Sequence, residues 1–304
     1  MKADALARRL TWEELDPAAL RHLVQLARRE DCAGWGLLHP PRNPQDLTSS
    51  VLETRAAVGR ADLMAREPMQ VCGLGLVPVV LEVYEAKGSF EPAVADGQAV
   101  GAGDRLGTLT GQTQALLQAE RVLLNFLQRL SGIASLTREY VGALGNPSTR
   151  LLDTRKTTPA FRVLEKYAVT CGGGRNHRIG LFDRVMLKDN HLSADGSTGG
   201  TALRNLVQRA RQQWPDYPVQ MEADRLEQIE PALEAGVDAL LLDNLSDAQL
   251  REAVQRVAGR AATEASGGIT RKRLPRLGAM GLDFVSTGAT VHQATWKDIG
   301  MDWR

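Results

Sequence analysis

The sequence predicts an α/β protein with a small mixed domain near the N-terminus and parallel βα units after it. Beyond residue 148, short apolar runs alternate with segments of helical periodicity, a pattern typical of βα architecture. Polar residues directly follow each of the apolar runs that we interpret as strands. Because functional groups lie at the carboxyl ends of strands in a βα barrel, this placement predicts a ring of polar residues on one face.

The N-terminal part begins with a predicted surface helix. Asp16 is a good N-cap before Pro17, and apolar residues recur at helical spacing up to Arg29. Between residues 54 and 111, short β-prone runs such as 77–83 alternate with glycine-containing turn signals. We therefore expect a small α+β domain in this region.

A long helix is expected from Gln114 onward. Leucines at helical spacing predict its buried side, and Arg121, Asn125 and Gln128 form a polar stripe on another. We interpret this helix as a bridge between two domains. The expected division is an N-terminal domain, 1–115, a barrel domain, 116–289, and a C-terminal segment, 290–304, that packs on the N-terminal domain.

The βα region contains six candidate strands and five helical patterns that fill the gaps between them. It shows neither an internal repeat nor a low-complexity segment. The strands are expected at residues 150–153, 184–187, 218–221, 238–242, 261–263 and 282–285. The helices are expected at residues 160–168, 201–213, 225–235, 247–258 and 270–277.

Composition narrows the class of protein. A net charge of +1 does not indicate a broad basic surface for nucleic acid or an anionic membrane, so any preference for anions must be local. Cys32, Cys72 and Cys171 lack CxxC spacing, which indicates neither a disulfide framework nor a zinc site. The N-terminus has no apolar signal core. We therefore expect a cytoplasmic protein with no membrane or nucleic-acid partner.

Cationic residues cluster around a run of three glycines between residues 154 and 192. Glycine lets the backbone approach a ligand closely, and arginine offers a planar fork for a carboxylate. We interpret the segment as a pocket for anions. A lone histidine is usually structural, and His177 receives a functional interpretation only because of its neighbours. The cluster consists of Arg155, Lys156, Arg175, His177, Arg178 and Lys188.

Two carboxylates follow neighbouring predicted strands. Glu222 and Asp243 suit a magnesium ion that bridges carboxylates and a polyphosphate, and they suit ribose hydroxyls equally well. Either carboxylate alone would fit an internal ion network with Lys188 and Arg155. Their placement at successive strand ends favours a functional role.

Two glycine-containing turns follow the last two strands. Barrels often hold a phosphate on backbone N–H groups at this position. Each turn alone would fit an ordinary strand-to-helix connection, with Thr270 as the helix cap after the first. Two turns at adjacent positions favour phosphate binding. They are residues 266–268 and 286–289.

Two other kinds of protein remain as alternatives. Lys188 could form a Schiff base at a barrel strand end, but that reaction needs an uncharged lysine, and this site is crowded with cations. A non-enzymatic anion-binding or RNA-binding protein is disfavoured by the near-zero net charge and by an aromatic content of only 5%.

Short motifs occur in a fixed order over most of the chain: DLTS at 46–49, REP at 66–68, DGQAVGAGD at 96–104, ERVLLNFLQRLSGIAS at 120–135, TRKTTP at 154–159, LEKYAV at 164–169, GGGRNHRIGL at 172–181, MLKDNH at 186–191, LLDN at 241–244, EASGGI at 264–269 and DFVSTGA at 283–289. Together they resemble one family, quinolinate phosphoribosyltransferase, a type II phosphoribosyltransferase. The resemblance implies an N-terminal open α/β sandwich domain plus an incomplete seven-stranded α/β barrel. It also implies a homodimer in which the neighbouring subunit completes each active site.

The resemblance implies a role for each group of site residues. The residues that look like quinolinate binders are Arg155, His177, Arg178 and Lys188, with Lys156 near 5-phosphoribosyl 1-diphosphate. The acids that are similar to the family's ribose and magnesium contacts are Glu222 and Asp243. The turns that resemble its 5-phosphate cradle contain Ser266, Gly267, Gly268, Ser286, Gly288 and Ala289. The implied catalytic residues are Lys156, Lys188, Glu222 and Asp243. Arg121 resembles an arginine donated by the partner subunit.

The implied reaction joins quinolinate to 5-phosphoribosyl 1-diphosphate and removes the 2-carboxylate. It yields nicotinate mononucleotide, diphosphate and CO2 for NAD biosynthesis, with Mg²⁺ and no tightly bound organic cofactor. A nicotinate-specific enzyme and the molybdenum-associated relatives are the alternatives within the superfamily. The dicarboxylate-sized cluster of cations argues against the first, and the REP and NHR segments argue against the second.

The chain departs from the family's usual pattern at several positions. None of the departures removes a charged residue at a strand end, so we expect altered substrate geometry rather than an altered reaction. The departures are Ala160, Phe161, Thr170, Met221, Ala223 and residues 290–293.

Overall fold

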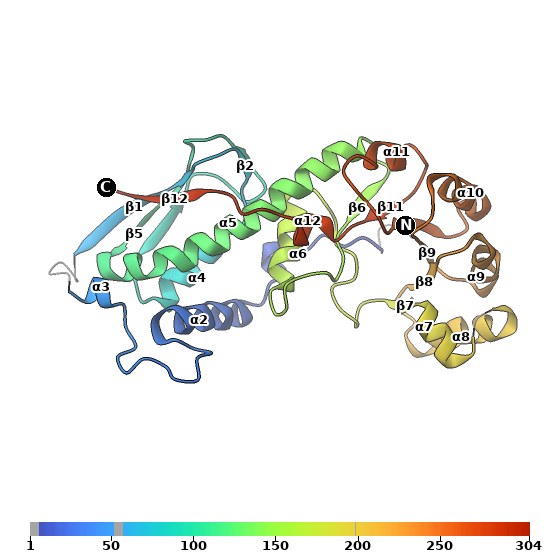
Figure 1. Ribbon diagram of the computed structural model, residues 1–304, viewed down its shortest axis with the longest axis horizontal. Helices are drawn as coiled ribbons and strands as arrows, with labels where there is room; N and C mark the ends of the chain where they lie inside the picture. The colour runs from blue at the N-terminus through green and yellow to red at the C-terminus, as the bar shows by residue number, and fades with distance from the viewer. Residues whose placement is uncertain (1–5, 52–56, 198) are drawn as a thin grey trace. The chain divides into compact units, whose positions relative to one another are not determined.

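The computed structural model describes residues 6–51, 57–197 and 199–304, in two compact units. One unit comprises the described residues of Thr11–Ser135 and Ala294–Arg304, and the other comprises residues 6–10 and Leu136–Gln293 (Figure 1). The division thus falls at 135 and 293, whereas the boundaries set from the sequence are 115 and 289. Residue 54, the expected start of the β-prone region, lies outside the described residues.

The unit that contains Thr11–Ser135 is built on a four-stranded antiparallel sheet in the order β12-β1-β5-β3. The C-terminal strand β12 pairs with β1, so the end of the chain belongs to this unit. Its strands are β1 (Val58–Ala65), β2 (Met69–Gln70), β3 (Ser89–Pro92), β4 (Ala99–Val100), β5 (Arg105–Gln112) and β12 (Ile299–Trp303). Its shorter helices are η1 (Trp12–Glu14), α2 (Pro17–Ala33), α3 (Leu47–Ser50) and α4 (Leu76–Val83).

The first predicted helix is confirmed and one predicted β run is wrong. The side chain of Asp16 accepts a hydrogen bond from the N–H of Ala18, and Pro17 opens α2. The run 77–83, expected to be β-prone, instead forms α4, which is buried along most of its length. Pro78 lies in the first turn, where no backbone N–H is required, and packing overrides the β preference of valine.

The long helix α5 (Thr113–Leu144) begins one residue before the predicted start. Its residues up to Ser135 belong to one compact unit, and those from Leu136 belong to the other. None of the described helices combines the length and apolar character that a membrane span requires.

The unit that contains Leu136–Gln293 is built on six parallel strands in the order β6-β11-β10-β9-β8-β7. All six predicted strands are confirmed, with small shifts at their ends. An isolated parallel bridge between Leu152 and Arg175 adds a seventh position beside β6. The strands are β6 (Arg150–Leu152), β7 (Val185–Leu187), β8 (Val219–Ala223), β9 (Ala239–Asp243), β10 (Ala262–Ser266) and β11 (Phe284–Ser286).

The helices of this unit follow the predicted pattern with one correction. The expected helix at 270–277 begins only at Leu274, after Arg273, so Thr270 is not its cap. The helices are α6 (Arg162–Cys171), α7 (Asp189–Asp195), α8 (Gly200–Gln213), η2 (Leu226–Gln228), α9 (Ile229–Ala235), α10 (Asp247–Val257), α11 (Leu274–Gly278) and α12 (Ala289–His292).

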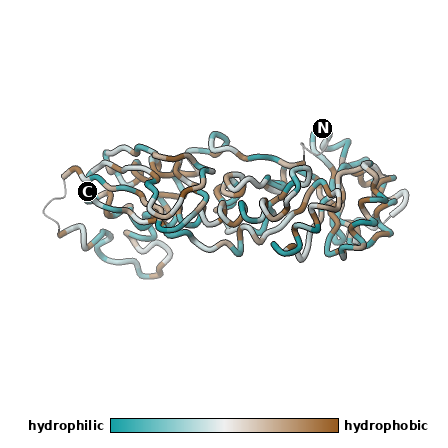
Figure 2. The backbone as a smooth tube through the Cα atoms, turned by 90° about the horizontal axis from the view of Figure 1, so that it is seen from above, coloured by the Kyte–Doolittle hydropathy of each residue, from teal (hydrophilic) through white to brown (hydrophobic). Residues whose placement is uncertain are grey.

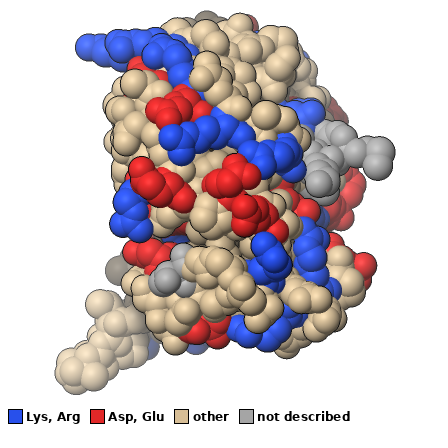
Figure 3. Space-filling view, turned by 90° about the vertical axis from the view of Figure 1, so that its right-hand side faces the viewer, with Lys and Arg blue, Asp and Glu red and all other residues tan. Residues whose placement is uncertain are grey.

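Hydrophobic residues occur along the chain in both units (Figure 2). In the barrel unit, Leu6 and Ala7 pack in one buried cluster with Phe284 and with small residues of the parallel strands. Residues 6–10, which carry no chemical signal in the sequence, therefore help to fill the barrel. Acidic and basic side chains are interspersed on the face in Figure 3, as a net charge of +1 would suggest.

Candidate active site

The carboxyl ends of the parallel strands surround one pocket of about 390 Å³. Because parallel strands end at the same edge of a sheet, side chains far apart in sequence meet here. The pocket is lined by Thr154, Arg155, Lys156, His177, Arg178, Met186, Lys188, Glu222, Leu241, Asp243, Glu264, Ser266 and Ser286. The structure thus brings together nine of the predicted site residues. Four others, Gly267, Gly268, Gly288 and Ala289, belong to the two turns just beyond Ser266 and Ser286.

Mutually repelling cations form one wall of the pocket. Burial lowers the pKa of Arg178, and the neighbouring guanidinium groups of Arg155 and Arg184 lower it further. The carboxylate of Asp183 opposes this effect and raises the pKa of Arg178. Such a wall is suited to binding an anionic ligand with directional arginine donors.

The two predicted acids occupy neighbouring strand ends. Glu222 lies on β8 and pairs with the ammonium group of Lys188, an ion pair that the sequence suggested as the structural alternative. Asp243 ends β9, and its Oδ2 accepts a hydrogen bond of 2.8 Å from the side chain of Asn244. Both carboxylates line the pocket and retain oxygens for a further ligand.

The first glycine turn needs glycine for conformational reasons. Gly267 has φ +83°, a left-handed conformation that disfavours other residues. A Cβ at this position would lie 2.1 Å from Oδ1 of Asn244. The second turn approaches the cationic wall closely, because a Cβ on Gly288 would lie 2.9 Å from Cδ of Lys156. The second turn therefore brings backbone close to a pocket residue.

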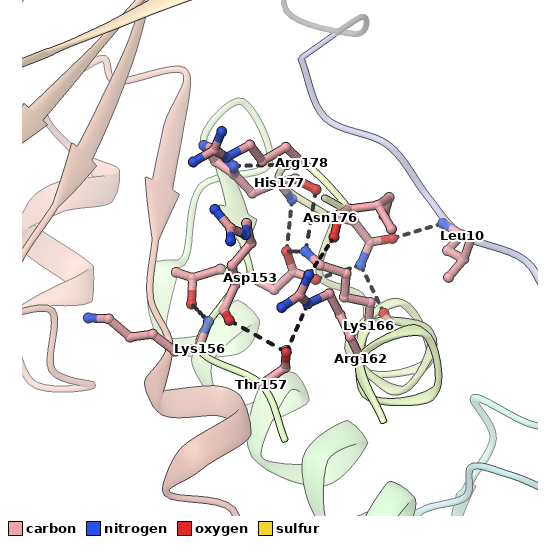
Figure 4. Close-up of polar contacts among 12 residues, drawn as sticks. Leu10, Asp153, Lys156, Thr157, Arg162, Lys166, Asn176, His177 and Arg178 are labelled. Atoms are coloured by element: carbon pink, nitrogen blue, oxygen red, sulfur yellow. Dashed lines mark hydrogen bonds and ion pairs between the residues drawn. The ribbon is translucent and has the colours of Figure 1, made fainter. Parts of the chain in front are cut away.

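A buried polar network holds the segment that carries His177 and Arg178 (Figure 4). Asp153 follows β6, is fully buried, and forms a 2.5 Å ion pair with Lys166 of α6. The same carboxylate accepts hydrogen bonds from the Asn176 side chain at 2.7 Å and from the His177 backbone at 2.9 Å. Burial raises the pKa of Asp153 and lowers that of Lys166. The network fixes the backbone next to the pocket.

Sequence reasoning missed several pocket residues. Glu264 is buried and lines the pocket, whereas the sequence analysis placed it among the polar residues after a predicted strand and in a motif but gave it no role. The available signal was its spacing: Glu264 lies two residues before Ser266 on β10, and side chains at that spacing point to the same face of a strand. The buried pair Lys166 and Asp153 had no such spacing signal, because one residue lies on a helix and the other follows a strand.

A second groove, of about 690 Å³, adjoins the pocket and shares Arg155, Arg178, Met186 and Lys188 with it. Leu181 and Phe182 line this groove and are 71% and 70% exposed. Two large apolar side chains exposed beside a charged pocket indicate a surface suited to contact with another molecule.

Arg121 is the one predicted site residue outside the barrel unit. It lies on the part of α5 that belongs to the unit of Thr11–Ser135, and its side chain is exposed. The barrel unit by itself therefore contains all the predicted site residues except this arginine.

A parallel barrel with a polar pocket at the carboxyl ends of its strands has the arrangement of the barrel enzymes. The chain belongs to the quinolinate phosphoribosyltransferase family. Residues 46–131 match the "Quinolinate phosphoribosyl transferase, N-terminal domain", and residues 133–302 match the corresponding C-terminal domain.

Named relatives and solved structures are similar over most of the chain. A probable nicotinate-nucleotide pyrophosphorylase [carboxylating] from Synechocystis sp. is 39% identical over 250 residues, covering 80% of this chain and 82% of the relative. A quinolinate phosphoribosyltransferase [decarboxylating] from Nicotiana glauca is 35% identical over 297 residues, covering 93% and 81%. The structure of the nicotinate-nucleotide pyrophosphorylase from Francisella tularensis matches with a TM-score of 0.85 at 32% identity, covering 96% of this chain and 98% of that one.

Proposed function

We propose that this chain transfers the phosphoribosyl group of 5-phosphoribosyl 1-diphosphate to quinolinate and decarboxylates the adduct to nicotinate mononucleotide. The observation that carries the proposal is the pocket in which Arg155, Arg178 and Lys188 face the carboxylates Glu222 and Asp243 at successive strand ends. The two curated relatives described above are named for this activity. The place of the reaction is the synthesis of NAD.

The cations of the pocket would bind and orient the two carboxylates of quinolinate. The guanidinium groups of Arg155 and Arg178 can each pair with a carboxylate in a fork, which sets the plane of the ring. The ring nitrogen then attacks C1 of the ribose as diphosphate leaves. After that bond forms, the 2-carboxylate leaves as CO2, its electron pair enters the positively charged ring, and a proton replaces it. Positioning and electrostatic stabilisation carry this chemistry without a covalent enzyme intermediate.

The ion pair between Lys188 and Glu222 argues against a Schiff-base lyase. A lysine must lose its proton to attack a carbonyl, and a paired carboxylate stabilises the protonated form instead. As a charged group, Lys188 is suited to binding an anion and Glu222 to keeping the ammonium in place.

Glu222 and Asp243 would hold Mg²⁺ together with the diphosphate substrate. The donor set fits this role, because magnesium prefers a few carboxylate oxygens completed by phosphate and water. When bound, the ion would supply charge stabilisation for the departing diphosphate. The carboxylates themselves would orient the ribose hydroxyls.

We further propose a homodimer in which Arg121 of the partner subunit completes each site. The support is that Arg121 is exposed and outside the barrel unit, and that Leu181 and Phe182 expose an apolar surface beside the pocket. Mixing Arg121→Ala subunits with Lys188→Ala subunits should restore activity, because half of the sites in a mixed dimer would contain neither substitution. An inactive preparation of proven mixed dimers would refute shared sites.

We also propose a reducing, cytoplasmic location. The support is that none of the three cysteines, Cys32, Cys72 and Cys171, forms a disulfide in the described structure. Disulfides are typical of oxidising compartments. Cell fractionation with an antibody against the protein would test the location.

The activity itself is tested by incubating the protein with quinolinate, 5-phosphoribosyl 1-diphosphate and Mg²⁺. CO2 and nicotinate mononucleotide should appear in equal amounts, and the Lys188→Ala variant should form neither at a comparable rate. Turnover of nicotinate in place of quinolinate would show a monocarboxylate enzyme. A folded protein that turns over neither acid would refute the proposal.

A further inference from the structure

The first step concerns Glu264, a charged residue inside the barrel. It lies in the middle of β10, is only 1% exposed, and lines the floor of the pocket. Gln220 holds its carboxylate with a hydrogen bond of 2.7 Å to Oε2.

The second step concerns the proton on the His177 ring. The backbone N–H of Arg178 donates to Nδ1 of His177 at 2.8 Å, so Nδ1 carries no proton. A neutral imidazole must then carry its proton on Nε2. That nitrogen lies 3.3 Å from Oε2 of Glu264, which can only accept.

The position of Arg184 does not change this assignment. Its Nη1 lies 3.0 Å from Nε2 of His177, but a guanidinium can only donate, and the same Nη1 donates to Oε1 of Gln220 at 2.8 Å. If Nε2 also accepted a hydrogen bond, both ring nitrogens would lack a proton, and an imidazolate does not form at neutral pH. The Nε2–H group therefore points to Glu264.

We infer that Glu264 is a positioning residue that accepts from the Nε2–H group of His177, so that the unprotonated Nδ1 anchors the backbone N–H of Arg178. Through this chain of contacts Glu264 directs Arg178 into the pocket without touching substrate. His177 then positions the arginine, because both of its ring nitrogens are occupied inside the protein. The inference rests on the proposed function only in naming quinolinate as the ligand of Arg178.

The first test is the ¹⁵N NMR spectrum of the histidine rings. The chain has only five histidines, so the His177 signals can be assigned with a His177→Asn variant. Between pH 6 and 8 the wild-type ring should show a protonated Nε2 and an unprotonated Nδ1. A ring protonated on Nδ1, or on both nitrogens, would overturn the inference. This measurement needs no substrate, so it is independent of the proposed activity.

The second test compares Glu264→Ala with the conservative Glu264→Gln, whose amide oxygen can still accept from Nε2. Glu264→Ala should lose the fixed Nε2–H signature and weaken quinolinate binding by roughly ten-fold or more, with 5-phosphoribosyl 1-diphosphate binding nearly unchanged. Glu264→Gln should restore the signature and most of the quinolinate affinity. The signals of His22 and His39, in the other unit, serve as internal controls.

Two outcomes would contradict the positioning role. Glu264→Ala could keep the Nε2–H signature and the quinolinate affinity, or both variants could weaken the two substrates equally, as a general structural defect would. If Glu264→Ala does not fold, the wild-type spectrum and Glu264→Gln still decide. If the protein shows the expected His177 signals but does not turn over quinolinate, the proposed function is refuted and the positioning role of Glu264 is not.

Discussion

Replacement of Lys166 by Met should destabilise the barrel unit through the charge that it leaves behind. Lys166 and Asp153 are both fully buried, and their atoms Nζ and Oδ1 are 2.5 Å apart. Methionine fills a similar volume, so the main effect is the unpaired carboxylate of Asp153. Breaking a buried ion pair at one partner costs about 3–5 kcal/mol.

The structure also gives an upper limit for the ionic part of this cost. Asp153 keeps neutral donors from Asn176 and the His177 backbone, but it can instead take up a proton. Protonating a carboxyl with an ordinary pKa of about 3.9 at pH 7 costs about 4 kcal/mol. Burial already raises the pKa of Asp153, so we expect this carboxyl group to be protonated in the variant. We therefore expect a loss of about 3–4 kcal/mol in the free energy of unfolding at pH 7.

The sign of the pH dependence follows from that protonation. A carboxyl whose pKa is raised in the folded state stabilises the protein below its unfolded pKa and loses this contribution as pH rises. The deficit of Lys166→Met relative to wild type should therefore shrink by about 1.4 kcal/mol per pH unit on going from pH 7 toward pH 5.

Urea unfolding followed by circular dichroism at pH 5 and pH 7 would measure both effects. The double variant Asp153→Asn/Lys166→Met is the matched control, because it removes the charge and keeps an acceptor for His177. It should be more stable than Lys166→Met at pH 7 and should depend little on pH. A Lys166→Met variant that loses less than about 1 kcal/mol, or loses the same amount at both pH values, would refute the reasoning.

Three further predictions concern the pocket. Arg178→Ala should weaken quinolinate binding by roughly ten-fold or more in calorimetry while sparing 5-phosphoribosyl 1-diphosphate; equal losses would contradict its role as a carboxylate ligand. Gly267→Ala should lower the free energy of unfolding by about 1–3 kcal/mol and raise the KM for 5-phosphoribosyl 1-diphosphate. The control is Gly103→Ala, because Gly103 has a similar φ of +88° but no atom within 4 Å of the added Cβ. If both variants lose the same free energy of unfolding, the clash with Asn244 has no role. The pKa of Glu264 is lowered to about 2, so the free energy of unfolding of the wild type should fall as pH drops from about 4.5. Glu264→Gln should lose less stability than the wild type between pH 5 and 3. An equal loss of stability in the two proteins over this range would contradict the prediction.

The strand ends were predictable because the pattern that marks them is local. An apolar run followed directly by Lys188, Glu222 or Asp243 needs no knowledge of what packs against it. Parallel topology then brings the ends of all such runs together. Six strands and seven of the nine predicted pocket residues could be placed on this basis, whereas His177 and Arg178 were predicted from the cationic cluster around the glycines.

The remaining features depend on contacts between distant segments. The run 77–83 consists mainly of residues that favour strands. It forms helix α4 because most of its side chains are buried by packing against other segments. Residues 6–10 show no chemical pattern, yet Arg184 donates to the carbonyl of Leu6 inside the barrel. Glu264 and His177 are 87 positions apart in the sequence. No local sequence pattern therefore predicts that one orients the other.

The arrangement of charge explains why the pocket requires an anion. The carboxylate of Asp153 is buried and already accepts hydrogen bonds from Lys166 and the His177 backbone, and Oε2 of Glu264 accepts one from Gln220. Burial lowers the pKa of Arg178, and the guanidinium groups of Arg155 and Arg184 beside it lower it further. A bound dicarboxylate would remove this repulsion and add charge-assisted hydrogen bonds. Ligand binding should consequently stabilise the barrel unit more than the contact area alone would suggest, because it relieves a cost that the empty pocket carries.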